Sequence, residues 1–213
     1  MKYIITFLIL LTSFCIFSQN KIAKKDKEIY NKLINELQNG SVEKGLKLAN
    51  STYNTAIKED NEVLEILMLS LLADGTVKKG NFLKANDFFL NSYNKITKMK
   101  ASYLKDSLLI QNFNNHGKAY LDSGNYAKGI KKINESLVIS KKNRDSIHIG
   151  GSYKWLGNAY AMQELYDDAI FYYTECVKYD TSVKMKFLVN SNLGNIYSRK
   201  KEVFYGKHRL PDN

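Results

Sequence analysis

The feature that most constrains the fold of this chain is a short pattern that recurs about every forty residues. In each copy a turn is followed by a hydrophobic residue and, three positions later, by a small one. The small residues Gly45, Ala85, Gly129 and Ala169 are 40, 44 and 40 residues apart. Self-similarity at a fixed period of about 20 to 50 residues is typical of repeat architectures. We therefore expect an array of similar units.

A second pattern lies between the copies of the first. It reads HGKAY from His116, LGNAY from Leu156 and LGNIY from Leu193, with a weaker copy, LADGT, from Leu72. Its glycines and tyrosines keep one register: Gly117, Gly157 and Gly194 are 40 and 37 residues apart, and Tyr120, Tyr160 and Tyr197 each follow a glycine by three. Two alternating patterns in each period predict two helices in each unit, joined by a tight turn.

In the best-defined unit, Gly157 and Ala169 lie on helix faces whose other residues are mostly large. Large residues recur three and four positions apart, which marks one face of a helix. The first-helix face is Tyr153, Leu156, Gly157 and Tyr160, and the second-helix face is Ala169, Ile170, Tyr173, Cys176 and Val177. Gly costs about 1 kcal/mol in a helix interior relative to Ala. Its recurrence predicts close helix packing, with Tyr160 and Tyr173 filling the grooves beside it.

This arrangement resembles the tetratricopeptide repeat, whose pattern is W-x-x-L-G-x-x-Y, then Ala, then Phe. Residues 150–181 match best. In that unit LGNAY is followed by Ala169, and Tyr153, Tyr173, Cys176 and Thr181 stand at the Trp, Phe, small and terminal Pro positions. The preceding unit, with Gly129, matches well. The first two units match mainly in their second helices, and the last unit matches in its first helix.

The resemblance implies an all-α fold, a right-handed α-solenoid of antiparallel helix pairs across residues 20–213. The units are expected near residues 26–65, 66–109, 110–149 and 150–186, with a partial unit at 187–213. The family's usual period is about 34 residues, so a period near 40 predicts about one extra turn in each helix. Such long-helix repeats resemble those of bacterial sensor and regulatory proteins.

The N-terminus has the form of a secretory signal peptide. Lys2 is followed by an apolar run from Tyr3 to Phe17, which is short for a bilayer span. We expect residues 1–19 to be removed by cleavage near Ser18–Asn20, which places the mature protein in the periplasm or cell envelope. An uncleaved N-terminal anchor is the alternative. Lipidation of Cys15 is rejected, because the preceding residue is the bulky Phe14.

The charge and cysteine content narrow the class of protein further. The net charge is +11, but the lysines are spread along the whole chain, as expected for solvated helix faces rather than for a nucleic-acid site. Removal of the signal segment leaves Cys176 alone, so an intramolecular disulfide is impossible. We expect stability to come from apolar burial and no nucleic-acid partner.

Residue patterns that support catalysis are missing from the sequence. His116 lies beside Gly117 on the packed face, and Cys176 lies on the packed face of its helix, so both are interpreted as structural. His148 and His208 have no partners at metal-ligand spacing. Gly150–Gly151 belongs to a helix-entry turn rather than to a phosphate loop. We therefore expect no enzyme activity, no cofactor and no metal.

The remaining candidate site is the groove that first helices line in this family. Its predicted residues are Asn114, Lys118, Lys154, Asn158, Asn192, Asn195 and Arg199. Asn can both donate to and accept from a peptide backbone, and Lys and Arg can hold a carboxylate. The resemblance adds that Lys154, Asn158 and Asn192 stand where chaperone-binding members keep part of a clamp for a C-terminal carboxylate. The opposing interpretation is that Asn and Lys are simply common in this chain.

Two functions remain open from the sequence. The first is an exported, non-enzymatic scaffold that binds a protein or peptide. The second is the sensory portion of a signal-transduction protein, of the histidine kinase or helix-turn-helix regulator type, whose membrane and output parts are absent from this chain. The helix around Leu193 and Tyr197 lacks a complete following partner, so self-association through the C-terminal repeat is a further expectation.

Overall fold

The computed structural model describes residues 22–207, with side chains described as far as Lys201. The predicted signal segment, its cleavage region and His208 lie outside the described residues. No helix within residues 22–207 combines the length and apolar character that a membrane span requires.

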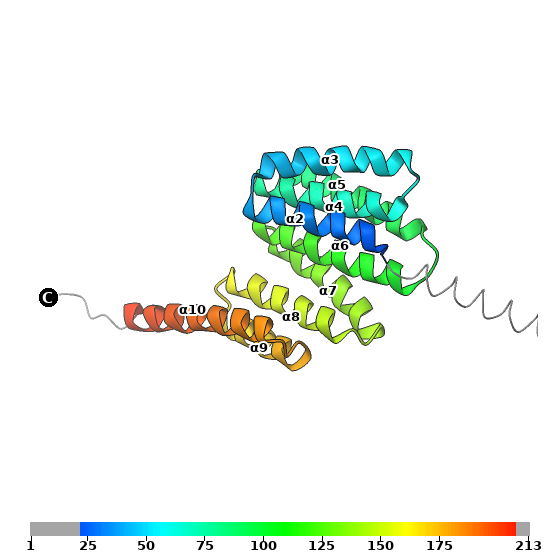
Figure 1. The fold of residues 1–213 in the computed structure, drawn as a ribbon. Coiled ribbons are helices and arrows are strands. Elements are labelled where there is room, and N and C mark those ends of the chain that lie inside the picture. Colours follow the sequence, from blue (N-terminus) through cyan, green and yellow to red (C-terminus); the bar gives the residue numbers. More distant parts are fainter. Residues whose placement is uncertain (1–21, 208–213) are drawn as a thin grey trace, which may run out of the picture. The chain divides into compact units, whose positions relative to one another are not determined.

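Throughout the described range the chain forms helices connected by short turns (Figure 1). They are α2 (Lys24–Asn39), α3 (Val42–Lys58), α4 (Glu62–Lys78), α5 (Phe82–Lys98), α6 (Tyr103–Asp122), α7 (Tyr126–Lys142), α8 (Ser146–Ala161), α9 (Tyr166–Tyr179) and α10 (Val183–Lys207). Helices that follow one another in the chain pack together, α8 with α9 most extensively. The prediction of an all-α solenoid built from helix pairs is confirmed.

The helix pairs begin earlier than the predicted units. First helices start at Glu62, Tyr103, Ser146 and Val183, four to seven residues before the expected boundaries at 66, 110, 150 and 187. The reason is local, because short polar turns end one helix and cap the next. The last helix also runs on to Lys207, so the segment after Arg199 extends α10.

One turn geometry joins most of these helices. At the α6–α7 turn, Gly124 has a positive φ of 80°, and the Asn125 N–H donates back to the Tyr120 carbonyl at 2.8 Å. This pattern satisfies the last carbonyls of the first helix. The Asn125 side chain then accepts from the Lys128 N–H at 3.3 Å and caps α7. The same geometry recurs at the turns α3–α4, α4–α5, α7–α8 and α8–α9.

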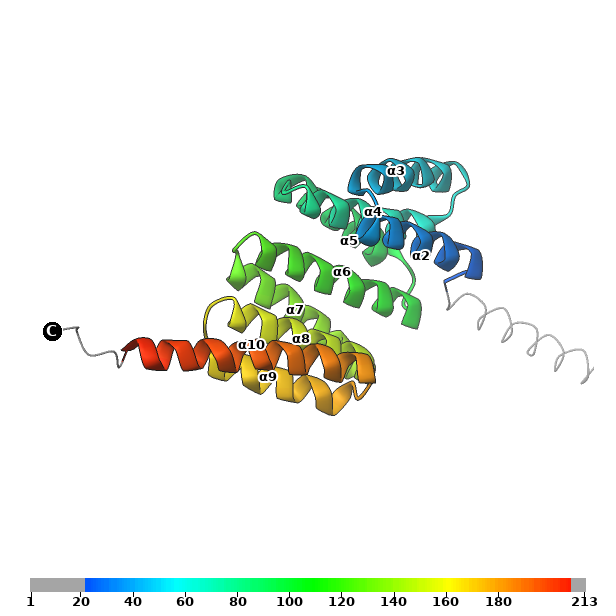
Figure 2. The same cartoon turned by 60° about the vertical axis from the view of Figure 1, so that its left-hand side comes forward.

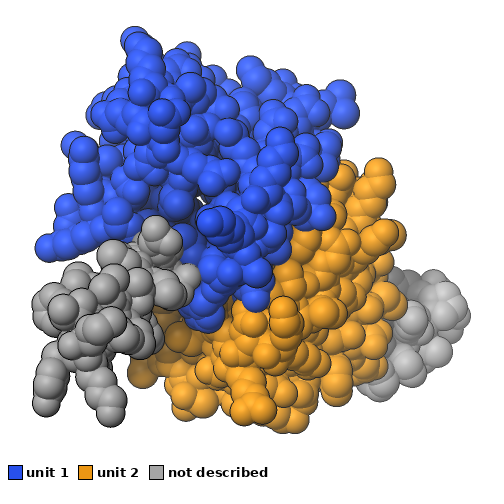
Figure 3. Space-filling model, turned by 90° about the vertical axis from the view of Figure 1, so that its right-hand side faces the viewer, with its two compact units in different colours: residues 1–112 blue, residues 113–213 orange. Residues whose placement is uncertain are grey.

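The chain divides into two compact units, residues 1–112 and 113–213, coloured separately in Figure 3. In the first unit α4 is the central helix and is buried almost all round, in keeping with its predominantly apolar segment EILMLSLL. Its buried carboxylate Glu65 pairs with Lys95 of α5 at 2.7 Å. The apolar core around it includes Leu37, Met68 and Ile96.

The second unit contains the end of α6 and the helices α7 to α10, which Figure 2 shows from a second side. Its core is built from the register of the sequence repeats, with Leu156 of α8, Ala169, Tyr173 and Cys176 of α9, and Ile196 of α10 buried. The small residues Gly45, Ala85, Gly129 and Ala169 are all buried at the fourth position of their helices. They let the paired helices approach each other, as the sequence predicts.

Candidate functional site

The glycine register of the first helices positions the candidate site in the second unit. A Cβ added to Gly157 would lie 2.7 Å from two ring carbons of Tyr173, so the ring occupies the space that the glycine leaves. Gly117 meets Ile133 of α7 in the same way, also at 2.7 Å. Gly194, which the sequence assigns to the same packing role, has no atom of another helix within 4 Å of its added Cβ. Within the described residues no second helix follows α10, as expected for a partial last unit, so Gly194 keeps the repeat register without the contacts that Gly117 and Gly157 make.

A hydrogen-bonded chain links three of the helices at this level. Asn192 of α10 donates from Nδ2 to the Tyr173 hydroxyl at 3.2 Å, and that hydroxyl donates to Asn158 Oδ1 of α8 at 2.7 Å. Burial raises the pKa of Tyr173 to about 12, so it remains a neutral donor at physiological pH. Asn158 and Asn192, which the sequence assigns to one groove, are held together through a tyrosine that the sequence assigns only to packing.

Lys154 lies one helical turn before Asn158 on α8 and is a half-buried cation. Its ammonium lies 3.6 Å from the centroid of the Trp155 ring. Burial is the main cause that lowers the pKa of Lys154 to about 8, and the nearby charges of Lys118 and Lys184 act in the same direction. No carboxylate among the described side chains pairs with it. An anion bound here would offset the cost of desolvation and reduce the repulsion between the lysines.

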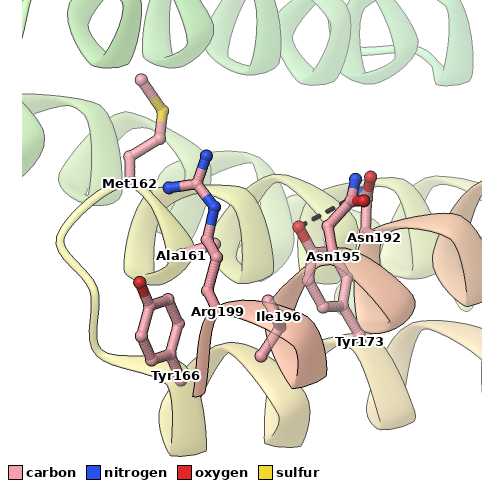
Figure 4. Close-up of a pocket in the computed structure, with 8 residues that line it drawn as sticks. All are labelled: Ala161, Met162, Tyr166, Tyr173, Asn192, Asn195, Ile196 and Arg199. Carbon is pink, nitrogen blue, oxygen red and sulfur yellow. Dashed lines mark hydrogen bonds between the residues drawn. The ribbon is translucent and has the colours of Figure 1, made fainter. Parts of the chain in front are cut away.

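A small pocket lies beside this chain of side chains, between the end of α8, the start of α9 and α10 (Figure 4). Its volume is about 220 Å³, and it is lined by Ala161, Met162, Tyr166, Tyr173, Asn192, Asn195, Ile196 and Arg199. The close-up shows the Arg199 side chain extending along the pocket toward Met162. Apolar walls with amide and guanidinium groups suit a side chain or a backbone carbonyl of an extended segment.

The seven predicted groove residues differ in their burial and in their partners. Lys154, Asn158 and Asn192 come together as described, and Asn195 and Arg199 are exposed beside them at the pocket. Lys118 is half-buried and pairs with Asp122 of its own helix at 3.6 Å. Asn114 does not line an exposed strip: it is buried, and its Oδ1 accepts from Ser152 at 3.3 Å. Asn114 is buried because its side of α6 faces the buried Ser152 of α8.

Sequence reasoning missed two residues at this site. Lys184 opens α10 and contributes to the positive potential around Lys154, and Trp155 supplies the ring beneath the Lys154 ammonium. The signal that could have found Lys184 is its position in the first turn of α10, the first helix of the last repeat unit. Lys184 is far from Lys154 in the sequence, and the packing of the helices brings the two charges near each other.

Two potentially reactive side chains in this unit, His116 and Cys176, are buried, whereas the partly exposed His148 pairs through Nδ1 with Asp145 at 2.7 Å. His116 is buried and stacked on Tyr120 with ring centroids 4.6 Å apart, and burial lowers its pKa to about 4. Cys176 is a buried free thiol whose pKa burial raises to about 11, so the nucleophilic thiolate is disfavoured. Among the described residues, no group of three His, Cys, Asp or Glu side chains could hold a metal ion.

Comparison with known proteins supports the fold and goes no further. No protein-family model matches this chain, and no curated protein is similar to it. Among solved structures it is similar to the crystal structure of BtubC (BKLC) from P. vanneervenii, with a TM-score of 0.64 and 18% sequence identity. The likeness covers 75% of this chain and 67% of that one. It fits the class of protein that the helices define, an all-α solenoid of helix pairs.

Proposed function

We propose that this protein is an exported, non-enzymatic scaffold of the tetratricopeptide-repeat type, which binds a protein or peptide through the first-helix face of its second unit. That face is defined by Lys118, Lys154, Asn158, Lys184, Asn195 and Arg199, from α6, α8 and α10. Its basic and amide character favours an acidic segment or a free C-terminal carboxylate as the ligand.

The observation that carries this proposal is the environment of Lys154. A half-buried ammonium without a carboxylate partner is costly, and its lowered pKa of about 8 expresses that cost. An incoming carboxylate would be drawn to a site that is already largely desolvated, where charge-assisted hydrogen bonds are strongest. Asn158, held by Tyr173 and Asn192, keeps its Nδ2 group available to donate to a ligand carbonyl.

The groove ligand can be tested with a defined substitution. Lys154→Met keeps the apolar stem over Trp155 and removes the charge, so helicity is retained. We expect a partner recovered from the cell-envelope fraction to bind this variant at least tenfold more weakly. A charge-assisted hydrogen bond contributes about 1.5–3 kcal/mol, which corresponds to one to two powers of ten. Isothermal titration calorimetry with the purified partner measures the loss.

The matched control is Lys131→Met on α7, because Lys131 is exposed and its substitution lowers the net charge equally. Binding by this control should equal that of the unaltered protein. Equal binding by Lys154→Met would show that the ligand contacts another surface, and weakened binding by both variants would indicate a general effect of net charge.

A further inference from the structure

The last helix, α10, presents to solvent the face that corresponds to a covered face of α8. The glycine register relates the two helices by an offset of 37 residues, which carries Gly157 onto Gly194. The same offset carries three further positions of α8 onto α10, so that Gly150, Tyr153 and Tyr160 correspond to Phe187, Asn190 and Tyr197. We call Phe187, Asn190, Gly194 and Tyr197 the open stripe of α10.

On α8 every position of this face is covered by α9. Tyr160 stacks on Tyr172 with ring centroids 5.1 Å apart, and Tyr153 packs against Tyr172 and Tyr179 at 6.2 and 5.6 Å. An added Cβ at Gly150 would lie 2.7 Å from the Cβ of Asp180. Together with the Tyr173 ring over Gly157, these contacts show that the face is shaped to receive an antiparallel helix.

On α10 no described residue covers the corresponding face. Phe187 is 73% exposed and Tyr197 is 55% exposed, and Val183, one turn before Phe187, is 85% exposed. Gly194 lies between Phe187 and Tyr197 on this face, and no described atom of another helix lies within 4 Å of its added Cβ. The opposite side of α10 is the one that packs, through Val189 and Ile196, on the rest of the unit. Two apolar sides on one helix imply two helical neighbours.

The charge around the open stripe selects the kind of neighbour. Six basic residues and one acidic residue lie within Val183–Lys207. Lys184 and Lys186 are exposed and stand roughly 80° to either side of Gly194 around the helix axis. A second copy of α10 would bring like charges together across the contact, which is unfavourable, whereas a negatively charged helix would be attracted to both flanks.

We propose that the open stripe of α10 binds an acidic amphipathic helix of a partner protein. The incoming helix inserts a large side chain at Gly194, as α9 inserts Tyr173 at Gly157, and its acidic residues lie against Lys184 and Lys186. This surface lies on the other side of α10 from Asn192 and Arg199. The two surfaces share Lys184 at the start of α10. Gly194 is not a residue of the groove, so substitution of Gly194 tests the open stripe separately from the groove proposed above.

The probe for this site is a synthetic peptide of residues 165–180 of this chain with Cys176→Ala. This segment is the natural cover of the equivalent face on α8, and it carries four acidic residues and one lysine. A matched peptide with Asp167→Asn, Asp168→Asn and Glu175→Gln keeps the shape and removes most of the charge. Binding of each fluorescently labelled peptide to the whole protein is followed by anisotropy at low and high salt.

The protein variant is Gly194→Leu, with Gly151→Leu of α8 as its control. Both glycines are helical and have open space around the added Cβ, so we expect both variants to fold, and circular dichroism checks their helicity. We expect saturable, salt-sensitive binding of the acidic peptide to the unaltered protein and to Gly151→Leu, and at least tenfold weaker binding to Gly194→Leu and of the neutral peptide.

Several results would overturn the inference. Absence of saturable peptide binding, or full binding by Gly194→Leu, would show that the stripe is not a helix site. Equal binding of the neutral and acidic peptides would remove the argument from charge. Sedimentation velocity covers the remaining case, since a dimer of the unaltered protein that Gly194→Leu abolishes would assign the stripe to a second copy of this chain.

Discussion

The Lys154 ammonium is the residue whose protonation the fold changes in a testable way. Its pKa is lowered to about 8, whereas a lysine of the unfolded chain titrates near 10.4. Between these values the unfolded state binds more protons, so this group's cost to stability is fully present below pH 8 and disappears as pH rises toward 10.4. Lys154→Met should therefore increase the free energy of unfolding at pH 7 by on the order of 1 kcal/mol. Denaturant unfolding at pH 7 and pH 10.5 measures this, and a gain of equal size at both values would contradict it.

The glycines of the repeat register differ in their surroundings, so the same substitution should have opposite effects. Gly157→Ala places a methyl group 2.7 Å from the buried Tyr173 ring, which the Asn158 hydrogen bond holds in place. We expect a loss of about 1–3 kcal/mol from overpacking. Gly194→Ala meets no other helix and should gain up to about 1 kcal/mol of helix propensity. Thermal unfolding of both variants is the measurement, and a melting temperature unchanged by Gly157→Ala would refute the packing account.

At the scale of the helices, the turn between α8 and α9 lacks the side-chain N-cap hydrogen bond that the other turns of this geometry have. Asn125 caps α7 and Asn81 caps α5, but the equivalent Leu165 makes no side-chain cap to α9. Leu165→Asn should supply an acceptor for the first turn of α9 and stabilise the protein by about 1 kcal/mol. Leu165→Ala serves as the control, since it removes the exposed leucine without adding a cap. Calorimetric melting temperatures that do not separate the two variants would argue against capping.

For the whole molecule, the predicted export signal is the claim with the simplest test. Lys2 and the apolar run to Phe17 predict removal of residues 1–19, so the native protein should begin near Gln19 or Asn20. Purification from the organism's envelope fraction, followed by N-terminal sequencing, reads the start directly. Recovery of the protein with Met1 intact would contradict cleavage, and Met1 on protein in a membrane fraction would favour the uncleaved anchor.

The fold class was accessible from the sequence because helix pairing is local. The period near forty residues, the small residues at the fourth helical position and the glycines Gly117 and Gly157 of the first helices all reflect contacts between neighbouring helices. Unit boundaries were less accessible. They depend on the backbone of a few turn residues, such as the positive φ of Asp60, and hydrophobic periodicity does not record that conformation.

The candidate site required the tertiary structure. Asn114 and Asn158 are equally polar in sequence, yet Asn114 is buried against Ser152 while Asn158 joins Tyr173 and Asn192 at the surface. Lys184 lies thirty residues from Lys154 in the chain, and its charge still contributes to lowering the pKa of Lys154. Gly194 has the same sequence context as Gly157 but none of its contacts. Periodicity encodes which face of a helix is apolar, whereas burial, charge proximity and an uncovered face depend on whether another helix packs there, and only packing in three dimensions decides that.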